Sequence, residues 1–177
     1  NWITLGGQNI VGVGTNLKFY IEQGGQYYDI TPIRYTVILT NPFTTTNLST
    51  TVLVTDVGHG CFTNDFVTYS GASTFNGVTL NGEYQVTVIN ANTYNITYAS
   101  AATGTGSGGG TVTAAYQLNT GSEISTPLTG WSAGAWGAGT WGNGGTNYTP
   151  IRVWSQSNFG EDLIFAYRGG VICYWEA

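Results

Sequence analysis

The chain has 177 residues and a mass of 18.8 kDa; 41% of its residues are hydrophobic, 14% aromatic and 7% charged. So few charges and so many aromatic residues exclude an intrinsically disordered chain, and the composition is not that of a coiled coil. Nine acidic residues against four basic ones give a formal net charge of -5, which removes the attraction that dominates nucleic-acid binding. The length suits one domain, or one domain with a small insertion.

The N-terminus carries no visible targeting signal. No stretch approaches the ~18 apolar residues of a membrane span, and the start at Asn1 has neither a basic region nor an apolar one. The missing initiator Met leaves two alternatives open, a processed N-terminus or a cut within a longer polypeptide.

Short runs rich in Val, Ile, Thr, Tyr and Phe alternate with Gly, Asn, Asp and Pro along the sequence. This pattern is typical of strands and turns, and no stretch predicts a long helix. The expected strands, in chain order, are Asn9–Val13, Leu17–Glu22, Tyr27–Ile30, Arg34–Leu39, Thr51–Asp56, Phe66–Tyr69, Glu83–Ile89, Tyr94–Tyr98, Thr111–Tyr116, Ile151–Trp154, Asp162–Tyr167 and Val171–Trp175.

Three pairs of turn residues lie between these runs: Gly24-Gly25, Asn81-Gly82 and Gly169-Gly170. Gly and Asn tolerate the positive φ that tight hairpin turns require. Because the connections are short, we expect neighbouring strands to be antiparallel.

Two stretches near the ends of the chain match each other without gaps, IVGVGTNLKFYIE (Ile10–Glu22) and IFAYRGGVICYWE (Ile164–Glu176). Each has a small-residue turn between two apolar runs, and Tyr20 matches Tyr174. A repeated hairpin is typical of propeller blades or of another radially repeated sheet. The second copy stops before the strand that should follow it, which favours a fragment of a larger protein that covers the open sheet edges.

The sequence between the two copies differs in character, with a Thr-rich entry and a glycine run at Gly104–Gly110. We therefore predict an all-β fold of incomplete antiparallel propeller-like blades, formed by residues 1–36 and 121–177, with residues 37–120 as an inserted small β-domain. The glycine run has no following Lys-Ser or Lys-Thr pair and precedes a strand. It is interpreted as a flexible turn and not as a phosphate-binding loop.

Three residues invite a catalytic or metal-binding interpretation: His59, which is the single histidine, and the cysteines Cys61 and Cys173. The cysteines form no C-x-x-C pair, so they are interpreted as buried free thiols, with a disulfide as the alternative. Cys61 is two residues from His59 and hard to orient toward its ring. We therefore interpret His59 as part of a turn and not as a catalytic residue.

The adjacent carboxylates Glu161 and Asp162 resemble an acid/base pair in sequence alone. Neighbouring residues of a strand point to opposite faces, whereas glycosidase carboxylates face each other. A hairpin turn with solvated charges is the better interpretation.

The most unusual segment is GWSAGAWGAGTWGNGG (Gly130–Gly145), which places Trp131, Trp136 and Trp141 five residues apart with Gly between them. Exposed tryptophans can stack on sugar rings, so these three are candidate glycan contacts. The alternative is a Gly-rich loop whose aromatic side chains pack against neighbouring subunits or blades, which makes the same three residues candidate interface contacts.

Several motifs within residues 37–120 carry a resemblance to a known family. They are Val54-Thr55-Asp56, Gly58-His59-Gly60, DFVTYSGA from Asp65, LNGEYQV from Leu80 and GGTVTAAY from Gly109. The segment resembles the small β-domain that is inserted in tail proteins of tailed bacteriophages. That domain is often labelled as similar to the first catalytic cysteine half-domain of ubiquitin-activating enzymes, which here implies no ubiquitin chemistry.

The flanking motifs are TNLKFY from Thr15, YDITPIR from Tyr28, Gly130-Trp131, GTWG from Gly139, Trp154-Ser155 and NFGEDLI from Asn158. They resemble the propeller-like part of podovirus tail tube or nozzle proteins, and the resemblance covers nearly the whole chain. It implies a virion protein of the phage tail that joins a ring with copies of itself and with other tail proteins. DNA leaves the capsid through that ring, and the resemblance implies no cofactor and no catalytic residues. Those subunits are several times longer, so this chain would be one part of one.

Two functions from different classes remain. The first is a non-enzymatic structural virion protein, part of the tail nozzle, whose negative wall would let DNA slide past without specific binding. The second is an extracellular receptor-binding module, an adhesin or tail-fibre domain, that binds a host surface glycan through Trp131, Trp136 and Trp141. No convergent nucleophile, base and orienting group is visible, so we predict that the chain is not an enzyme and has neither metal nor cofactor.

Overall fold

A computed structural model describes residues 1–123 and 151–176 of the chain. These residues form sixteen strands in four sheets, and all pairs of neighbouring strands are antiparallel. The prediction of an all-β fold built from antiparallel sheets is confirmed. No closed ring of blades is present among these residues, nor any helix that could cross a lipid bilayer.

The chain divides into two compact units. Unit 1 comprises Asn1–Ile30 and Gly121–Ala177, and unit 2 comprises Thr31–Thr120. Strand β5 (Ile33–Thr40) belongs to unit 2 and includes residue 36, at which the predicted first blade segment ends.

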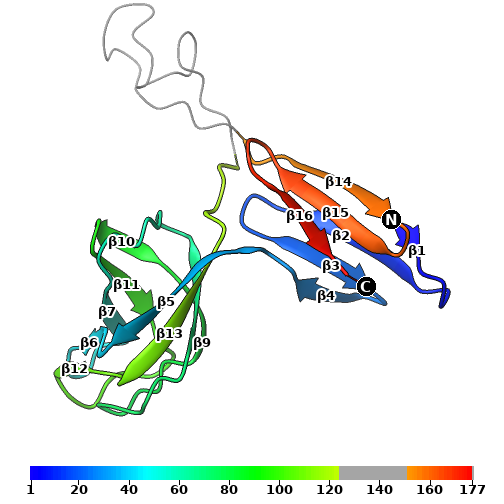
Figure 1. Ribbon diagram of the computed structural model, residues 1–177. Coiled ribbons are helices and arrows are strands. Elements are labelled where there is room, and N and C mark those ends of the chain that lie inside the picture. The colour runs from blue at the N-terminus through cyan, green and yellow to red at the C-terminus, as the bar shows by residue number, and fades with distance from the viewer. Residues whose placement is uncertain (124–150, 177) are drawn as a thin grey trace, which may run out of the picture. The chain divides into compact units, whose positions relative to one another are not determined.

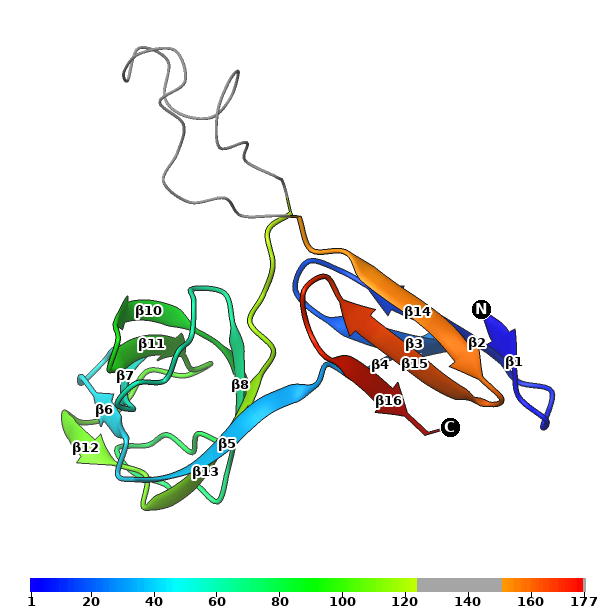
Figure 2. The same ribbon diagram turned by 45° about the horizontal axis from the view of Figure 1, so that its top comes forward.

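Unit 1 consists of two sheets, which lie one over the other in both views (Figures 1 and 2). The N-terminal sheet has the strand order β1 (Trp2–Ile3), β2 (Asn9–Gly14), β3 (Phe19–Gln23) and β4 (Gln26–Asp29). The C-terminal sheet has the order β14 (Trp154–Phe159), β15 (Asp162–Tyr167) and β16 (Ile172–Trp175).

Aromatic side chains fill the space between these two sheets. The rings of Phe19 and Phe165 are stacked, with centroids 4.4 Å apart and an interplanar angle of 6°. The ring centroids of Trp154 and Phe19 are 4.8 Å apart, and those of Trp2 and Trp175 are 6.5 Å apart in an edge-to-face arrangement. Aromatic pairs bury large areas and prefer such offset or edge-on geometries, so five strands from the two ends of the chain share one small core.

Two glycines of β2 let β14 approach closely. A Cβ on Gly14 would lie 2.3 Å from the Trp154 ring, and one on Gly12 would lie 2.0 Å from the Gln156 side chain. In the space so left, Trp154 Nε1 donates to the Thr15 carbonyl at 2.7 Å and Gln156 Nε2 donates to the Gly12 carbonyl at 3.0 Å. Glycine is therefore needed in β2 for steric reasons, although it weakens an isolated strand.

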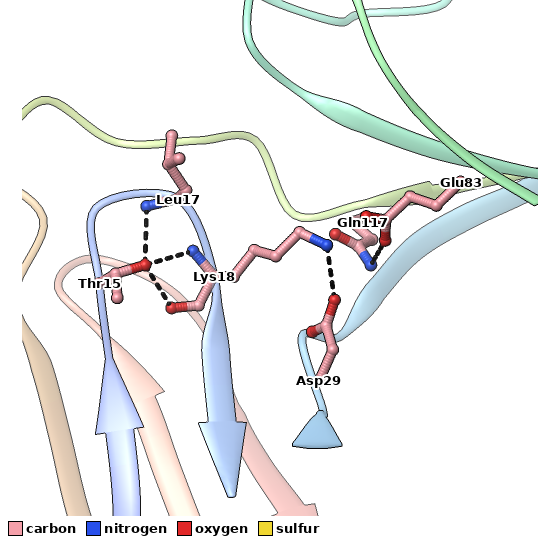
Figure 3. Close-up of polar contacts among 6 residues, drawn as sticks. All are labelled: Thr15, Leu17, Lys18, Asp29, Glu83 and Gln117. Carbon is pink, nitrogen blue, oxygen red and sulfur yellow. Dashed lines mark hydrogen bonds and ion pairs between the residues drawn. The ribbon is translucent and has the colours of Figure 1, made fainter. Parts of the chain in front are cut away.

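The turn between β2 and β3 is closed by a threonine side chain (Figure 3). Thr15 Oγ1 accepts from the backbone N–H groups of Leu17 and Lys18, at 3.2 and 2.9 Å. Lys18 is almost fully buried, and its Nζ lies 2.7 Å from Asp29 Oδ2 at the end of β4. This ion pair ties the turn to the edge strand.

The two similar stretches are both hairpins, but their strands pair in different registers. Phe19 pairs with Gly14, whereas Cys173, which aligns with Phe19, pairs with Phe165. Gly14 aligns with Arg168, so the first strand of the second hairpin is shifted by three residues. A shift by an odd number exchanges the two faces of a strand, and the residue-by-residue match therefore holds for the second strands and is wrong for the first.

Unit 2 also has two sheets, which enclose one core. The five-stranded sheet has the order β10 (Thr87–Asn90), β11 (Thr93–Thr97), β7 (Thr51–Thr55), β6 (Phe43–Thr45) and β12 (Gly106–Gly108). The four-stranded sheet has the order β5, β13 (Thr111–Gln117), β8 (Phe66–Ser70) and β9 (Gly82–Gln85). Alternation of buried and exposed residues along β7, β11 and β13 points one face of each into the core.

Most predicted strands agree with the structure to within one or two residues, and two differ by more. The predicted strand 83–89 is divided between β9 and β10, in different sheets. Val86 separates them because its N–H donates to the Asp65 carbonyl and its carbonyl accepts from Asn64, both at 2.8 Å. Strand β14 begins at Trp154, where the predicted strand 151–154 ends. Strands β1, β6 and β12 were not predicted, since runs of two or three residues carry no periodic signal.

Two of the three predicted hairpin turns are present in the structure, and the third is not. Gly24, Gly25 and Gly169 have positive φ and connect hairpins as expected. Gly82 also has positive φ, but it lies within β9, and residues 71–81 connect β8 to β9, so the expected tight turn there is wrong.

The glycine run is not simply a flexible turn. Residues Gly106–Gly108 form β12, which pairs with β6. A Cβ on Gly108 would lie 2.8 Å from the Phe75 ring, and one on Gly109 would lie 2.5 Å from the Phe43 ring. The missing side chains therefore let the backbone pass against two aromatic rings.

Candidate functional site

The three tryptophans predicted as interface or glycan contacts, Trp131, Trp136 and Trp141, lie outside the described residues. Three other places carry functional groups that can be described. They are a buried polar cluster in unit 2, a pocket beside β9, and the outward faces of the two sheets of unit 1.

His59 is buried, with 1% of its surface exposed. Its Nδ1 accepts from the backbone N–H of Cys61 at 3.0 Å, so Nε2 carries the proton and donates to the Asn90 carbonyl at 2.9 Å. Both ring nitrogens therefore bond to the backbone, and the histidine links the loop after β7 to the end of β10. This agrees with its interpretation as a turn residue.

The Cys61 thiol is buried beside a cation. The Nη2 of Arg34 lies 3.1 Å from Cys61 Sγ and donates to the His59 carbonyl at 2.8 Å. Burial nevertheless raises the pKa of the Cys61 thiol to about 12, against the lowering effect of Arg34. The thiol therefore stays protonated near neutral pH and is a weak nucleophile. Cys173 is likewise a free thiol, partly buried in unit 1.

A chain of hydroxyl groups crosses the core of unit 2 and ends on a carboxylate. Tyr116 donates to Asp56 Oδ2 at 2.6 Å, so it must accept from Tyr94 at 2.7 Å, which in turn accepts from Tyr69 at 2.5 Å. Burial raises the pKa of all three tyrosines. The phenols therefore keep their protons and satisfy the buried Asp56.

Asp65 is the second buried carboxylate, with 1% exposure. Its Oδ2 accepts from the Phe62 N–H and the Asn119 side chain, and its Oδ1 accepts from the N–H and hydroxyl of Thr120. These four bonds hold the last residues of unit 2 to the loop before β8.

The buried polar cluster thus has a structural role. Its histidine has no ring nitrogen left to act as a base, its thiol is protonated, and its carboxylates are hydrogen-bonded. Among the residues that the structure describes, no group of three or more His, Cys, Asp and Glu side chains could hold a metal ion.

The adjacent carboxylates of unit 1 have separate partners. The Glu161 carboxylate accepts from the backbone N–H of Leu5, and the Asp162 carboxylate accepts from the Tyr174 hydroxyl. Trp2 Nε1 also donates to the Glu161 carbonyl, at 2.7 Å. The Glu161 carboxylate therefore links two turns, the Asp162 carboxylate links β15 to β16, and the two do not form a facing pair.

A pocket of about 480 Å³ lies where the chain passes from β9 in one sheet of unit 2 to β10 in the other. Its lining residues come from β9, the start of β10, the end of β11 and the two positions that follow β11. The lining residues are Glu83, Tyr84, Gln85, Thr87, Thr97, Tyr98 and Ala99.

Glu83 is unusual among the charged residues of unit 2. The unit contains one basic residue, Arg34, and three acidic ones, Asp56, Asp65 and Glu83, a net charge of 1 − 3 = −2. Asp56 and Asp65 are buried and Arg34 is half-buried, so Glu83 is the one charged residue exposed at the surface of this unit. Its carboxylate accepts from Gln117 Nε2 at 2.9 Å (Figure 3).

The outward face of the N-terminal sheet of unit 1 combines apolar side chains with the carboxylates of Glu22 and Asp29. Ile10 and Phe19 point into the core, so alternation puts Val11, Val13 and Tyr20 on the other face. Tyr27 of β4 joins them, with its ring 6.4 Å from that of Tyr20 and 65% of its surface exposed.

The outward face of the C-terminal sheet has apolar residues on β15 and β16 and serines on β14. Pairing places Ile164 opposite Tyr174 and Ala166 opposite Ile172, on the side away from the buried Phe165. Ile172 is 77% exposed and Tyr174 59% exposed. A strand with apolar residues on both faces is typical of a sheet covered on both sides.

Comparisons with known proteins identify no family. No protein-family model matches the chain, and no curated protein matches it. One solved structure that it resembles is described as a phage phi92 endosialidase, with 22% sequence identity and a TM-score of 0.43. The match covers 63% of this chain and 18% of that one, so the chain spans less than a fifth of that protein's length.

The pocket and the two outward faces were missed by the sequence analysis. A signal for the pocket exists: Glu83 is the one charged residue between positions 66 and 122. A signal for the C-terminal face also exists, because Leu163, Ile164, Phe165 and Ala166 are apolar in succession, which breaks the alternation of a half-exposed strand.

Proposed function

We propose that this chain is a non-enzymatic structural segment of a tailed-bacteriophage virion, part of a podovirus-type tail tube or nozzle. In this proposal unit 1 contributes sheets to a propeller-like ring that is formed with copies of the chain and with other tail proteins. Unit 2 is the small β-domain carried on that ring, and DNA passes without specific binding.

One observation carries the proposal. Both outward faces of unit 1 carry exposed apolar side chains beside polar ones, with Tyr27 exposed on one face and Ile172 and Tyr174 exposed on the other. Blades of a propeller are sheets that pack face to face, each covered by its neighbours on both sides. Exposed apolar side chains on both outer sheets of unit 1 allow further sheets to pack on either side of it.

The charge and the buried chemistry support the same proposal. The net charge of -5 disfavours adhesion of a passing phosphate backbone. The polar cluster of unit 2 contains no activated nucleophile or free base. The motifs that resemble those of nozzle proteins lie in both units, which supports a role for the whole chain in one assembly.

The location in the virion is tested by immunogold electron microscopy. An antibody raised against the 177-residue chain is applied to purified phage particles that encode the sequence. Gold at the distal end of the tail tube is the expected result. Gold on lateral fibres would instead support the receptor-binding alternative that uses Trp131, Trp136 and Trp141, and particles without gold would overturn both.

The packing role is tested by sedimentation velocity of the isolated chain. We expect the wild type to self-associate and the double variant Ile172→Asp/Tyr174→Asp to remain monomeric, since two charges on the apolar face oppose stacking. Val57 and Leu48 of unit 2 are 79% and 81% exposed, so Val57→Asp/Leu48→Asp is the matched control and should associate like the wild type. Equal behaviour of both double variants would contradict the proposal.

A further inference from the structure

We infer that strand β5 of unit 2 is a self-pairing surface, through which two copies of the chain join their four-stranded sheets edge to edge. The two copies are then related by a two-fold axis, whereas a contact that builds a ring repeats in one direction. This inference goes beyond the structural role proposed above. It concerns unit 2 alone, so either can fail without the other.

The first argument is that one side of β5 presents unpaired backbone groups. β5 is the end strand of its sheet, with β13 on one side (Figure 1). The N–H of Asn41, directly after β5, donates to the Gly110 carbonyl, directly before β13, at 2.8 Å. Alternate residues of an antiparallel strand bond to the same neighbour, so three residues direct their N–H and carbonyl groups to the open side: Thr36, Ile38 and Thr40. None of these three has a backbone partner there among the residues that the structure describes.

The second argument is a contrast with the other edges of unit 2. β9 and β10 are four residues long; β9 contains the charged Glu83, and the pairing of β10 is irregular between Val88 and Asn90. β12 has three residues, two of them Gly. Short, charged, irregular or glycine-containing edges resist pairing with another strand. β5 has eight residues without Pro or Gly, and residues 35–40 are uncharged and pair regularly with β13.

The third argument is that this edge is complementary to itself. When two copies of β5 run antiparallel with Ile38 opposite Ile38, Thr36 of each copy lies opposite Thr40 of the other. The open N–H and carbonyl groups of these three residues then face each other in pairs, so each of them gains a partner. Thr–Thr pairs and apolar pairs are both favourable across antiparallel strands, and no like charges are brought together.

Pairing also covers apolar side chains on both faces of the sheet. Ile38 is 69% exposed on the outer face. Val37 and Leu39 pack against the core of unit 2 but are only half-buried. In the paired register Val37 of each copy lies opposite Leu39 of the other, in the type of pair that brings side chains closest together. A second copy of β5 therefore supplies the apolar cover that the end strand lacks.

The contact is small, so the dimer is weak. A single strand pair buries less than the ~1,200 Å² of stable interfaces, and we expect a dissociation constant of about 0.1–1 mM. Such a dimer forms at concentrations above those of sedimentation velocity. The monomer expected there for Ile172→Asp/Tyr174→Asp is therefore unaffected.

The test uses the full chain with Ile172→Asp/Tyr174→Asp, in which association through unit 1 is suppressed. The ¹⁵N-labelled protein is followed by NMR from micromolar to millimolar concentration. We expect translational diffusion to slow toward that of a dimer and amide hydrogen exchange of Thr36, Ile38 and Thr40 to slow several-fold at the highest concentration. Chemical-shift changes should be confined to residues 35–40 and their neighbours in β13.

Charge exchange at the centre of the contact tests the two-fold register. Ile38 is exposed, so Ile38→Lys and Ile38→Glu keep the fold testable. Each variant alone places like charges opposite each other and should lose the concentration dependence. An equimolar mixture of the two should regain it, because Lys then lies opposite Glu.

A second pair of variants provides a matched control at the same positions. Thr36→Lys/Thr40→Glu should pair at least as well as the parent protein, because each Lys lies opposite a Glu of the other copy. Thr36→Lys/Thr40→Lys should not pair, since it brings like charges together at both ends of the contact.

Four outcomes would overturn the inference. They are exchange of the three amides that is already slow in dilute protein, behaviour that does not change up to millimolar concentration, dimers that persist in Ile38→Lys and in Ile38→Glu alone, and a mixture of these two that does not regain pairing. The first would mean that the edge is covered within one chain. None of these outcomes bears on ring assembly or on the location of the chain in the virion.

Discussion

Units 1 and 2 are both pairs of antiparallel sheets, yet they bury their apolar residues very differently. Sixteen buried residues form the core of unit 2, whereas six form the core of unit 1 among the residues described. Unit 1 instead places large apolar side chains such as Ile172, Tyr174 and Tyr27 on its outward faces. Unit 2 therefore has the larger buried core, and unit 1 has the smaller core together with exposed apolar side chains on its sheets.

The difference also extends to polar groups. Unit 2 buries two carboxylates, a histidine and a chain of tyrosines, each with hydrogen-bond partners. The corresponding space in unit 1 is filled by aromatic rings that come from both ends of the chain. A satisfied polar network specifies a unique core, whereas the aromatic rings of unit 1 contribute mainly buried apolar area.

The largest expected effect is the loss of the aromatic stack in unit 1. Phe19→Ala should lower the free energy of unfolding of unit 1 by about 3–5 kcal/mol, because it removes a fully buried ring from a small core. The sequence of unit 2 contains no tryptophan, and Trp2, Trp154 and Trp175 belong to the described part of unit 1, so tryptophan fluorescence during urea unfolding does not report on unit 2. Phe43→Ala in unit 2 is the counterpart and should leave the tryptophan transition unchanged. A shift of that transition by Phe43→Ala would mean that the units unfold together.

A smaller effect is expected where β14 crosses β2. Gly14→Ala should destabilise unit 1 by about 1–3 kcal/mol, because the new methyl group overlaps the Trp154 ring and forces it to move. The same fluorescence experiment measures it. Gly6→Ala, whose added carbon would meet its nearest neighbour at 3.7 Å, is the control, and equal melting of the two variants would refute the steric explanation.

In unit 2 the loss of stability on replacing a tyrosine of the hydroxyl chain by phenylalanine should depend on the position of that tyrosine in the chain. Tyr116→Phe removes the donor to Asp56 and the acceptor for Tyr94, and should cost about 1–3 kcal/mol. Tyr69→Phe removes only the end of the chain and should cost less, about 0.5–1.5 kcal/mol. Tyrosine near-ultraviolet circular dichroism during urea unfolding distinguishes them. The reverse ranking would show that the hydroxyls do not act as one chain.

The smallest expected effect is the loss of stability of unit 2 as the pH rises. Burial raises the pKa of Cys61 from 9.0 to about 12 and that of Tyr35 from 10.0 to about 12. The folded protein therefore keeps protons that the unfolded chain loses, so the stability of unit 2 should be constant below about pH 9 and fall between pH 9 and 12. Urea unfolding at successive pH values tests this, and Cys61→Ala should reduce the slope where it begins. A stability that rises above pH 9 would contradict the burial of these groups.

Much of the fold was predictable because its signals are local. The strands around Phe19, Tyr94 and Val112 carry clear alternation, and paired glycines mark two of the hairpin turns. The division of 83–89 at Val86 was not predictable, because it depends on backbone bonds to Asn64 and Asp65 far back in the chain.

The candidate sites were harder to predict for the same reason. The pocket joins Glu83 and Tyr84 of β9 to Tyr98 after β11, and only the folded topology brings them together. The register of the second hairpin likewise follows from pairing of Phe165 with Cys173 and not from the matching letters of the two stretches. Alternation of apolar and polar residues predicts which side chains of a strand share one face of a sheet. It does not predict which other strand packs against that face.

The strands that begin and end unit 2 are neighbours. Strand β5 pairs with β13, and the N–H of Leu118 donates to the carbonyl of Pro32 at 2.9 Å. When the two ends of a segment lie side by side, the residues before and after it are also close together, so the flanking chain could be joined directly if the segment were removed. Residues 31–120 therefore have the geometry of a domain inserted at one position of the chain. Replacement of this segment by another domain whose ends lie equally close together would leave the sheets of unit 1 connected as before.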